Sequence, residues 1–550
     1  ILPSDVLAHV NRVIHYTFLA SPGMMRAAGE TLSGGGSNAW AVAPQRSASG
    51  NALLLANPHL PWGDLFTWFE AHLNSTDLDL YGAALVGFPL VSIGFNERLG
   101  WTHTVNTIDG ADLYELTLVP GGYRWNGGVR AFDRTVELLR VRTEQGERTD
   151  TLVVLHSVQG PVLAANATRA LALRVAGNDQ PHLFQQTWEM ARARSLREFE
   201  EAIRPLQLPM FTIMYADRDG RIMHVFNGRI PKRARGDWSF WSRPVPGDTS
   251  ALVWTETHDF ADLPVVVDPS TGWLQNANDP PWTTTLPAAL DPGRYPPYFA
   301  PRSPPRFRPQ HSLRMLAADS SITFEELIAY QRSTRLELAD RILDELVAAT
   351  RARGTSRARR AAEVLARWDR SANAGSRGAV LFQAFMREAE QKRWPGNSIF
   401  AVRWSETRPL TTPDGLSDAV QAVATLDEAA GRVERLYGAL DVPWGDVYRL
   451  QRDSLDLPAN GAGDDLGSFR VLNFERSGAR YTASGGDSFI AVIEFGRTVR
   501  ASALLPYGNA SQPGSPHRTD QLPLFARQEL RSVWLRREDI MANLQERKRF

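Results

Sequence analysis

The stretch "LSGGGSNAW", residues 32–40, decides how this chain is interpreted. Three glycines, Gly34 to Gly36, lead directly into Ser37, and the apolar run "NALLLANPHL" follows at residues 51–60. Glycine permits backbone conformations that other residues resist. The run is therefore either a hinge before a strand or a point at which the chain is cut. A cut before Ser37 would turn that serine into an N-terminus.

An N-terminal serine has chemistry that an internal serine lacks. An internal hydroxyl needs a neighbouring base to become a nucleophile. The α-amine of an N-terminal serine is such a base, because its pKa of about 7.7–8.0 leaves part of it neutral near pH 7. Other hydrolase signatures are missing, since the sequence has no G-x-S-x-G, no H-E-x-x-H and no Walker A motif.

Composition sets broad limits on function. The chain has 550 residues, a formal net charge of zero and no cysteine. Neutral charge gives no reason to expect nucleic acid or an anionic membrane as partner, and the lack of cysteine excludes disulfides and thiolate chemistry. The apolar run at residues 80–95 is too short to span a bilayer and predicts buried strands joined by a turn.

The pattern along the chain predicts an α+β layered fold. Apolar residues at helical spacing mark residues 5–29, and short strand patterns fill 37–310, with a hairpin at "ADRDGR". The proline-rich residues 280–310 carry aromatic side chains, so we expect an ordered excursion over a surface. Thr323 and Glu326 form a capping box in a mainly helical insertion at about 313–390. Strand patterns return toward the C-terminus.

The residues around Ser37 resemble the start of the catalytic subunit in the penicillin acylase family of N-terminal-nucleophile (Ntn) amidohydrolases. The resemblance covers nearly the whole chain and includes "GFPLVSIGFNERLGWTHTVN", "YADRDG", "LQNANDPPW", "RPQHSLRM" and "PYGNASQPGSPHRTDQL". It implies a four-layer αββα sandwich with additional helical and β segments. It also implies autocatalytic cleavage at Gly36–Ser37.

On this resemblance, residues 1–36 are the end of an α chain plus spacer, and residues 37–550 are the β chain. The sequence begins without Met and without a basic leader region, so we expect a processed piece whose missing α chain would complete an αβ heterodimer. The family further implies a small N-acyl amide substrate, no required cofactor, and a periplasmic or secreted location.

The resemblance assigns catalytic roles to four residues. Ser37 would be the nucleophile, and His59 in "NPHL" would hold its amine in place. The backbone N–H of Val105 and the side-chain amide of Asn278 would form the oxyanion hole. A turn role before "DPP" suits Asn276, and a structural role for His59 stays open at this point.

The acyl group is predicted from the expected pocket. Leu85 and Ser92 occupy the positions where glutaryl-specific relatives grip a carboxylate, so glutaryl substrates should be poor. An apolar pocket favours medium to long aliphatic chains, such as those of acyl-homoserine lactones or lipopeptides. Side chains of β-lactam antibiotics are the alternative substrate, and an inactive or binding protein is a further one. The expected pocket residues are Leu60, Trp62, Leu85, Ser92, Trp188, Phe211 and Arg314.

A structural calcium ion is one further expectation from the family. Asp109 and Asp112 in "TIDGADLY" match carboxylates that hold calcium in penicillin acylases, and hard oxygen ligands suit that ion. The sequence has no matching acid shortly after "NAND", which counts against the site.

Overall fold

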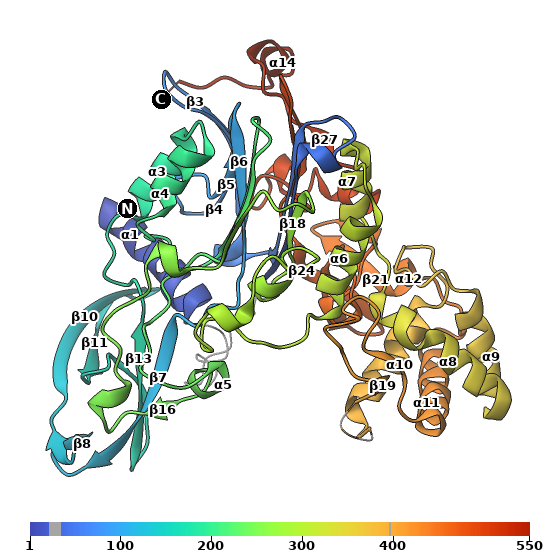
Figure 1. Cartoon of the computed structure of the whole chain (residues 1–550), viewed down its shortest axis with the longest axis horizontal. Helices are drawn as coiled ribbons and strands as arrows, with labels where there is room; N and C mark the ends of the chain where they lie inside the picture. The colour runs from blue at the N-terminus through green and yellow to red at the C-terminus, as the bar shows by residue number, and fades with distance from the viewer. Residues whose placement is uncertain (21–34, 395, 397, 550) are drawn as a thin grey trace.

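The computed structural model describes residues 1–20, 35–394, 396 and 398–549. Two central β-sheets form the middle of the molecule, a smaller β-rich region lies on one side, and a helical region lies on the other (Figure 1). Within the described residues, no helix is long and apolar enough to cross a membrane.

The first central sheet contains the glycine–serine stretch. Its order is β22-β21-β24-β2-β25-β26-β27, with β1 pairing with both β2 and β18, and β23 pairing with β24. The strands are β1 (Gly36–Val42), β2 (Ala52–Pro61), β18 (Trp273–Asn276), β21 (Tyr448–Arg452), β22 (Leu455–Pro458), β23 (Leu472–Ser477), β24 (Arg480–Asp487), β25 (Ile490–Phe495), β26 (Val499–Leu504) and β27 (Arg531–Ser532).

The second central sheet has the order β17-β15-β14-β6-β5-β4-β3, and all its pairs are antiparallel. Its strands are β3 (Trp68–Asn74), β4 (Asp79–Leu85), β5 (Ile93–Phe95), β6 (Leu99–Thr104), β14 (Thr212–Asp217), β15 (Ile222–Val225) and β17 (Val265–Val267). β14 and β15 form the hairpin predicted at "ADRDGR", and Gly220 in its turn has a positive φ that suits glycine.

The two central sheets pack face to face. Small and branched side chains alternate inward along β1, β2 and β25 and meet residues of β4, β5 and β14 in one apolar cluster. The other face of the first sheet packs on α6 (Phe307–Ala318) and α7 (Phe324–Gln331). The other face of the second sheet packs on α3 (Leu183–Arg192) and α4 (Leu196–Ile203).

The β-rich side region consists of a six-stranded sheet and a long hairpin. The sheet contains β7 (Ala111–Val119), β8 (Gly122–Trp125), β9 (Gly128–Arg130), β12 (Val162–Ala165), β13 (Arg169–Val175) and β16 (Val245–Pro246). The hairpin pairs β10 (Asp133–Thr143) with β11 (Gly146–His156). Short α5 (Trp238–Trp241) lies nearby (Figure 1).

The helical region extends further than the sequence pattern predicts. It contains α8 (Glu337–Arg353), α9 (Ser356–Arg367), α10 (Ala379–Gln391) and α11 (Ala419–Tyr437), which share one apolar cluster. The strand pair β19 (Phe400–Val402) and β20 (Asp414–Leu416) interrupts it. α10 ends at Gln391, close to the predicted end of the helical pattern, and α11 follows the strand pair. The remaining helices are α12 (Trp444–Val447), α13 (Leu522–Ala526) and α14 (Arg537–Ala542).

Several local predictions are confirmed. Thr323 and Glu326 form the expected capping box at the start of α7. Residues 80–95 form two strands, β4 and β5, joined by a turn. The proline-rich stretch buries Tyr298 and Phe299 in the cluster beneath α3 and α4, so it is an ordered excursion. At the N-terminus, α1 (Pro3–Asn11) continues as a π-helix, η1 (Arg12–Leu19); the rest of the predicted helix falls mainly on residues 21–29, outside the described part.

Candidate active site

Ser37 lies near the start of β1, buried between the two central sheets. β1 pairs with β2 in a register that sets Gly36 opposite His59 and Ser37 opposite Pro58. The chain is continuous here, so Ser37 N is a peptide nitrogen, and its N–H donates to Asn278 Oδ1 at 2.6 Å. The hydroxyl donates to the carbonyl oxygen of Gly36 at 2.5 Å. The nucleophile candidate therefore lies directly beside the bond that the sequence predicts to be cut.

Two hydrogen-bond donors lie next to the Ser37 hydroxyl. The backbone N–H of Val105, which follows β6, lies 3.4 Å from Ser37 Oγ. Asn278 Nδ2 donates one hydrogen to the carbonyl oxygen of Val105 at 2.6 Å, and its second hydrogen has no hydrogen-bond partner among the described residues. A backbone N–H and a side-chain amide that converge on a nucleophile can stabilise a developing oxyanion. The structure thus brings together Ser37, Val105 and Asn278 from three separate parts of the chain.

The turn after β18 holds Asn278 in place. Asn276 Oδ1 accepts the N–H of Asn278 at 3.0 Å and the hydroxyl of Thr104 at 2.6 Å. Asp279 Oδ1 accepts the N–H of Ala277 at 2.9 Å. Asn278 itself has a φ of 63°, a left-handed conformation that asparagine tolerates better than most residues. Asn276 therefore has a turn role, and Asn278 presents its side chain toward Ser37.

Arg308, at the start of α6, is an active-site residue that sequence reasoning missed. Its buried guanidinium donates to Ser37 O at 2.7 Å, to Asn38 Oδ1 at 2.6 Å and to Asn278 Oδ1 at 2.8 Å, and it pairs with Asp464 at 2.6 Å. A guanidinium only donates hydrogen bonds. The atom of Asn278 that faces it must therefore be the oxygen, which directs the Nδ2 group toward Val105. Arg308 thus fixes the orientation of the Asn278 side chain.

His59 lies in a buried polar group beside Gly36. His59 Nε2 lies 3.1 Å from Asn57 Oδ1 and 3.2 Å from Asp487 Oδ1, both acceptors, so Nε2 carries the proton. Burial lowers the pKa of His59, against the raising effect of Asp487, and favours the neutral ring. Nδ1 has no hydrogen-bond partner among the described residues and faces Gly36, where a Cβ atom would lie 3.6 Å away.

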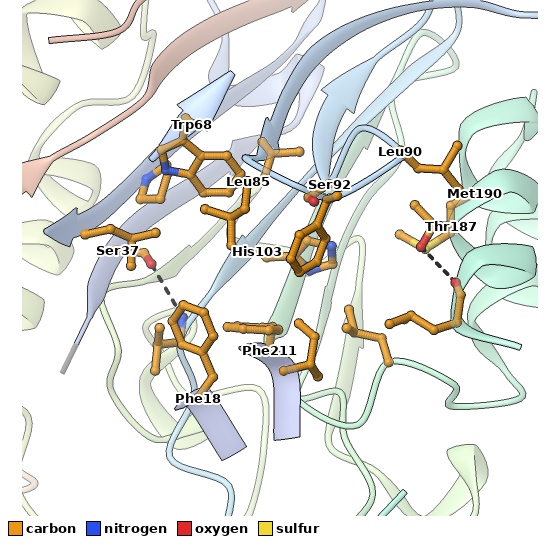
Figure 2. A pocket seen from close by; sticks show the side chains of 18 of the residues that line it. Phe18, Ser37, Trp68, Leu85, Leu90, Ser92, His103, Thr187, Met190 and Phe211 are labelled. Carbon is orange, nitrogen blue, oxygen red and sulfur yellow. Dashed lines mark hydrogen bonds between the residues drawn. The ribbon is translucent and has the colours of Figure 1, made fainter. Parts of the chain in front are cut away.

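An apolar cavity opens at Ser37 and runs between the second sheet and the helices that cover its end (Figure 2). Ser37 and Val105 stand at one end of its lining, and Thr187 and Met190 of α3 stand at the other. Its wall is mostly carbon and comes from η1, β2, the β4–β5 segment and α3. Examples are Ile14, Phe18, Leu60, Trp68, Leu85, Phe88, Leu90, Leu183, Phe184 and Phe211.

The structure separates the predicted pocket residues into two groups. Leu60, Leu85, Ser92 and Phe211 line the cavity. Trp62 does not line it, because its side chain turns to the helical region, where its indole N–H donates to Asp487 O at 2.8 Å. Trp62 therefore lies outside the cavity lining that the structure describes.

Trp188 and Arg314 also lie away from the cavity lining. Trp188 packs at the edge of the cluster beneath α3, and the Arg192 guanidinium lies 5.8 Å from its ring centroid. Arg314 forms ion pairs with Glu337 and Asp340. Six residues on an α-helix turn the side-chain direction by about 600°, which is about 120° short of two full turns, so Arg314 faces α8 while Arg308 faces Ser37. Neither side chain is brought to the cavity lining that the structure describes.

Asp109 and Asp112, the predicted calcium ligands, both pair with a buried arginine. The buried Arg233 Nη2 lies 3.0 Å from a carboxylate oxygen of each, and the Trp254 indole N–H donates to Asp112 at 2.6 Å. A guanidinium already supplies the positive charge there, and a divalent cation beside it would be repelled. Among the described residues, no group of three or more His, Cys, Asp or Glu side chains is arranged to hold a metal ion.

Comparison with known proteins agrees with this geometry. The sequence profile of the penicillin amidase family matches residues 3–542. The chain belongs to the penicillin amidase family. Among its relatives is the acyl-homoserine lactone acylase PvdQ of Pseudomonas fluorescens strain Pf-5, 29% identical over 534 residues, or 90% of this chain and 68% of the relative. The aculeacin-A acylase of Actinoplanes utahensis is 26% identical over 553 residues, or 90% of this chain and 68% of that protein.

The fold of this penicillin amidase family member is also seen in a solved structure. The thermostable penicillin G acylase from Alcaligenes faecalis superposes with a TM-score of 0.68 at 18% sequence identity, covering 94% of this chain and 99% of that chain. The named relatives are acylases, so the family resemblance drawn from the residues around Ser37 is confirmed. The chain is placed among enzymes that hydrolyse amide bonds.

Proposed function

We propose that this protein is an acylase that cleaves the amide bond of N-acylated small molecules through an acyl-enzyme on Ser37. The proposal includes cleavage at Gly36–Ser37, which divides the protein into a chain ending at Gly36 and a chain starting at Ser37. A periplasmic or secreted location stays a prediction from the family. The steps below are assigned to groups of this chain and to water.

Self-cleavage would start from the contact between the Ser37 hydroxyl and the Gly36 carbonyl. Ser37 Oγ attacks the carbonyl carbon of Gly36, its proton passes to the nitrogen of Ser37, and the C–N bond breaks as an ester forms. Water then hydrolyses the ester, which leaves a Gly36 carboxylate and a free Ser37 amine. Gly36 suits this site, because a Cβ atom there would lie 3.2 Å from Asn278 Oδ1.

Turnover would use the freed amine as the base. The neutral amine accepts the Ser37 hydroxyl proton as Oγ attacks the substrate carbonyl carbon, and the oxyanion accepts hydrogen bonds from Val105 N–H and Asn278 Nδ2. Collapse of this intermediate breaks the amide C–N bond, and the proton goes to the leaving amine. Water, deprotonated by the same base, releases the acyl group as a carboxylic acid and restores Ser37.

The observation that carries the proposal is the meeting of Ser37, Val105 N–H and Asn278 at one end of an apolar cavity. The packing of two sheets between α3–α4 and α6–α7 supports the finer inference of an Ntn-hydrolase αββα sandwich. Cleavage before a serine at the start of a strand in such a sandwich gives that serine an amine base of its own. The serine then needs no partner histidine.

The apolar wall supports a preference for aliphatic acyl chains. Each methylene removed from water contributes about 0.8 kcal/mol, and remote binding energy of this kind orients the carbonyl against Ser37. Ionised acyl groups are disfavoured, since no Lys or Arg is among the lining residues of the cavity that the structure describes. The names of the relatives, which include acyl-homoserine lactone and aculeacin acylases, agree with such chains.

The acyl preference is tested with homoserine lactones of increasing chain length, alongside glutaryl and phenylacetyl amides. We expect kcat/KM to rise from four-carbon chains to about ten or twelve carbons, because each added methylene leaves water. Glutaryl should fall well below a neutral acyl group of equal length, and Ser92→Arg should narrow that gap by supplying a cation. Glutaryl as the best substrate, or rates independent of length, would contradict the apolar-pocket account.

Phenylacetyl side chains of β-lactams are the second candidate substrate. The rings of Phe18 and Phe211 meet edge to face at 5.1 Å within the cavity wall, and such a wall also accepts a phenyl ring. The phenylacetyl amide in the same series decides between the two. A protein that hydrolyses none of these amides would instead fit the alternative of a non-catalytic binding protein.

A further inference from the structure

Two polar side chains interrupt the apolar wall of the cavity at mid-length. Ser92, just before β5, and His103 of β6 both line it. In Figure 2 they lie between Ser37 at one end and Met190 and Thr187 at the other. The reaction derived above uses neither of them. Buried polar side chains usually have hydrogen-bond partners, so we ask what this pair binds in a cavity that is otherwise lined with carbon.

The sheet register brings these two side chains together. Gly94 pairs with Trp101, and Phe95 pairs with Gly100. Continuing this antiparallel register two residues past the last pair places Ser92 across from His103, and both residues line the same cavity. Ser92 still follows the sheet on its other side, where its N–H donates to Ala83 O at 2.9 Å. Directly opposite residues send their side chains to the same face, with Cβ atoms about 4.5–5.5 Å apart. Both polar groups can therefore reach one ligand atom.

The polar groups of Ser92 and His103 have no hydrogen-bond partner in the described part of the protein. No hydrogen bond joins the His103 ring or the Ser92 hydroxyl to another side chain or backbone group there, whereas the Thr187 hydroxyl donates to Leu183 O at 2.9 Å. Desolvation lowers the pKa of His103 to about 4, so the ring is neutral at physiological pH and has one donor and one acceptor nitrogen. A polar ligand atom would satisfy groups that otherwise remain unpaired.

The distance between His103 and Val105 gives the position of that ligand atom along the acyl chain. His103 precedes Val105 by two residues along the strand, or roughly 7 Å at the usual rise of an extended chain. In the proposed mechanism the Val105 N–H binds the carbonyl oxygen of the acyl group, so its position gives the position of that oxygen. A distance of roughly 7 Å corresponds to about five carbon–carbon bonds of an extended acyl chain. The pair therefore faces the middle of the chain and not its first carbons.

We propose that Ser92 and His103 form a recognition point for an uncharged oxygen, a hydroxyl or a keto group, near the sixth carbon of the acyl chain. The inference rests on the proposed acylase function and narrows its substrate class to mid-chain oxygenated acyl groups. A neutral imidazole and a hydroxyl together can donate to a keto oxygen, and either can accept from a hydroxyl. A carboxylate at the same point would be buried without a cation, which is unfavourable.

The test compares amides of decanoic, 3-hydroxydecanoic and 6-hydroxydecanoic acids on the processed wild-type protein, with adipoyl amide as the ionised control. We expect the 6-hydroxy compound to exceed the unsubstituted one in kcat/KM by about tenfold, because the site otherwise leaves polar groups unpaired. The 3-hydroxy compound should gain less. His103→Leu should remove the 6-hydroxy advantage, and His103→Gln, which keeps a donor and an acceptor, should retain part of it.

Calorimetric binding of the same amides to the Ser37→Ala protein separates this inference from the proposed function. Tighter binding of the 6-hydroxy amide, lost in the Ser37→Ala/His103→Leu double variant, would support the recognition point even if turnover failed. Equal binding of the hydroxylated and unsubstituted amides would overturn it, and so would a 6-hydroxy advantage unchanged by His103→Leu. Preference for adipoyl that depends on His103 would also overturn it, since the site would then be a carboxylate grip.

Discussion

Ser37→Ala is expected to reduce turnover of any acyl amide to background. Removal of a nucleophile leaves only the residual effect of binding and oxyanion donors, and losses of about a millionfold are typical. The same change removes the hydroxyl that contacts the Gly36 carbonyl, so the protein should also remain a single chain. The rate of hydrolysis with a chromogenic decanoyl amide measures the first effect, and gel electrophoresis measures the second.

Ser47→Ala is the matched control for that variant, because Ser47 contacts Ser49 and lies outside the cavity lining. It should retain both processing and turnover. In the wild type, the rate should rise with pH through the α-amine pKa of about 8, since the neutral amine is the base. Turnover by Ser37→Ala above that of a heat-inactivated sample would refute the assignment of the nucleophile.

Loss of the Asn278 side chain is expected to lower kcat by about 100- to 1000-fold with little change in KM. The hydrogen bond from Nδ2 strengthens as charge develops on the substrate oxygen, so its loss raises the barrier more than it weakens binding. Asn278 has a φ of 63°, and alanine would add backbone strain there. Asn278→Gly, which accepts this conformation, should therefore accompany Asn278→Ala. Steady-state kinetics on processed protein give both constants.

The two Asn278 variants should agree if the side chain acts on the oxyanion. If backbone strain were the only effect, Asn278→Ala would have a lower folding stability, and Asn278→Gly would keep its catalytic activity. A thermal unfolding curve for each variant records that difference. A large rise in KM at an unchanged kcat, in either variant, would mean that Asn278 binds substrate and does not stabilise the transition state.

The sequence predicts those features that depend on local pattern or on distinctive motifs. The glycine–serine stretch and "NAND" are distinctive enough to identify the family. The hairpin at "ADRDGR" and the capping box at Thr323 depend on residues close together in the chain, so local rules find them. The helical pattern that the sequence predicts to about residue 390 ends with α10, and α11 follows only after the β19–β20 pair.

The sequence does not show which way a side chain points in the folded protein. Arg308 and Arg314 lie on one helix, and only the packing of α6 shows that the first faces Ser37 and the second faces α8. Arg308 is the first residue of the motif "RPQHSLRM", but that motif also contains Arg314 and does not show which of the two arginines faces β1. Arg233 lies far along the chain from Asp109 and Asp112, so their pairing could not be read from local spacing.

The mass of the chain that contains the active site tests the central claim most directly. Wild-type protein, purified in its folded state, should be analysed by intact mass spectrometry and N-terminal sequencing. The account predicts a polypeptide that begins with Ser37 and reads "SNAWAV", and this polypeptide should be absent from the Ser37→Ala protein. Folded wild-type protein that hydrolyses acyl amides while its Gly36–Ser37 bond stays intact would contradict the account, because no free amine would then exist to act as the base.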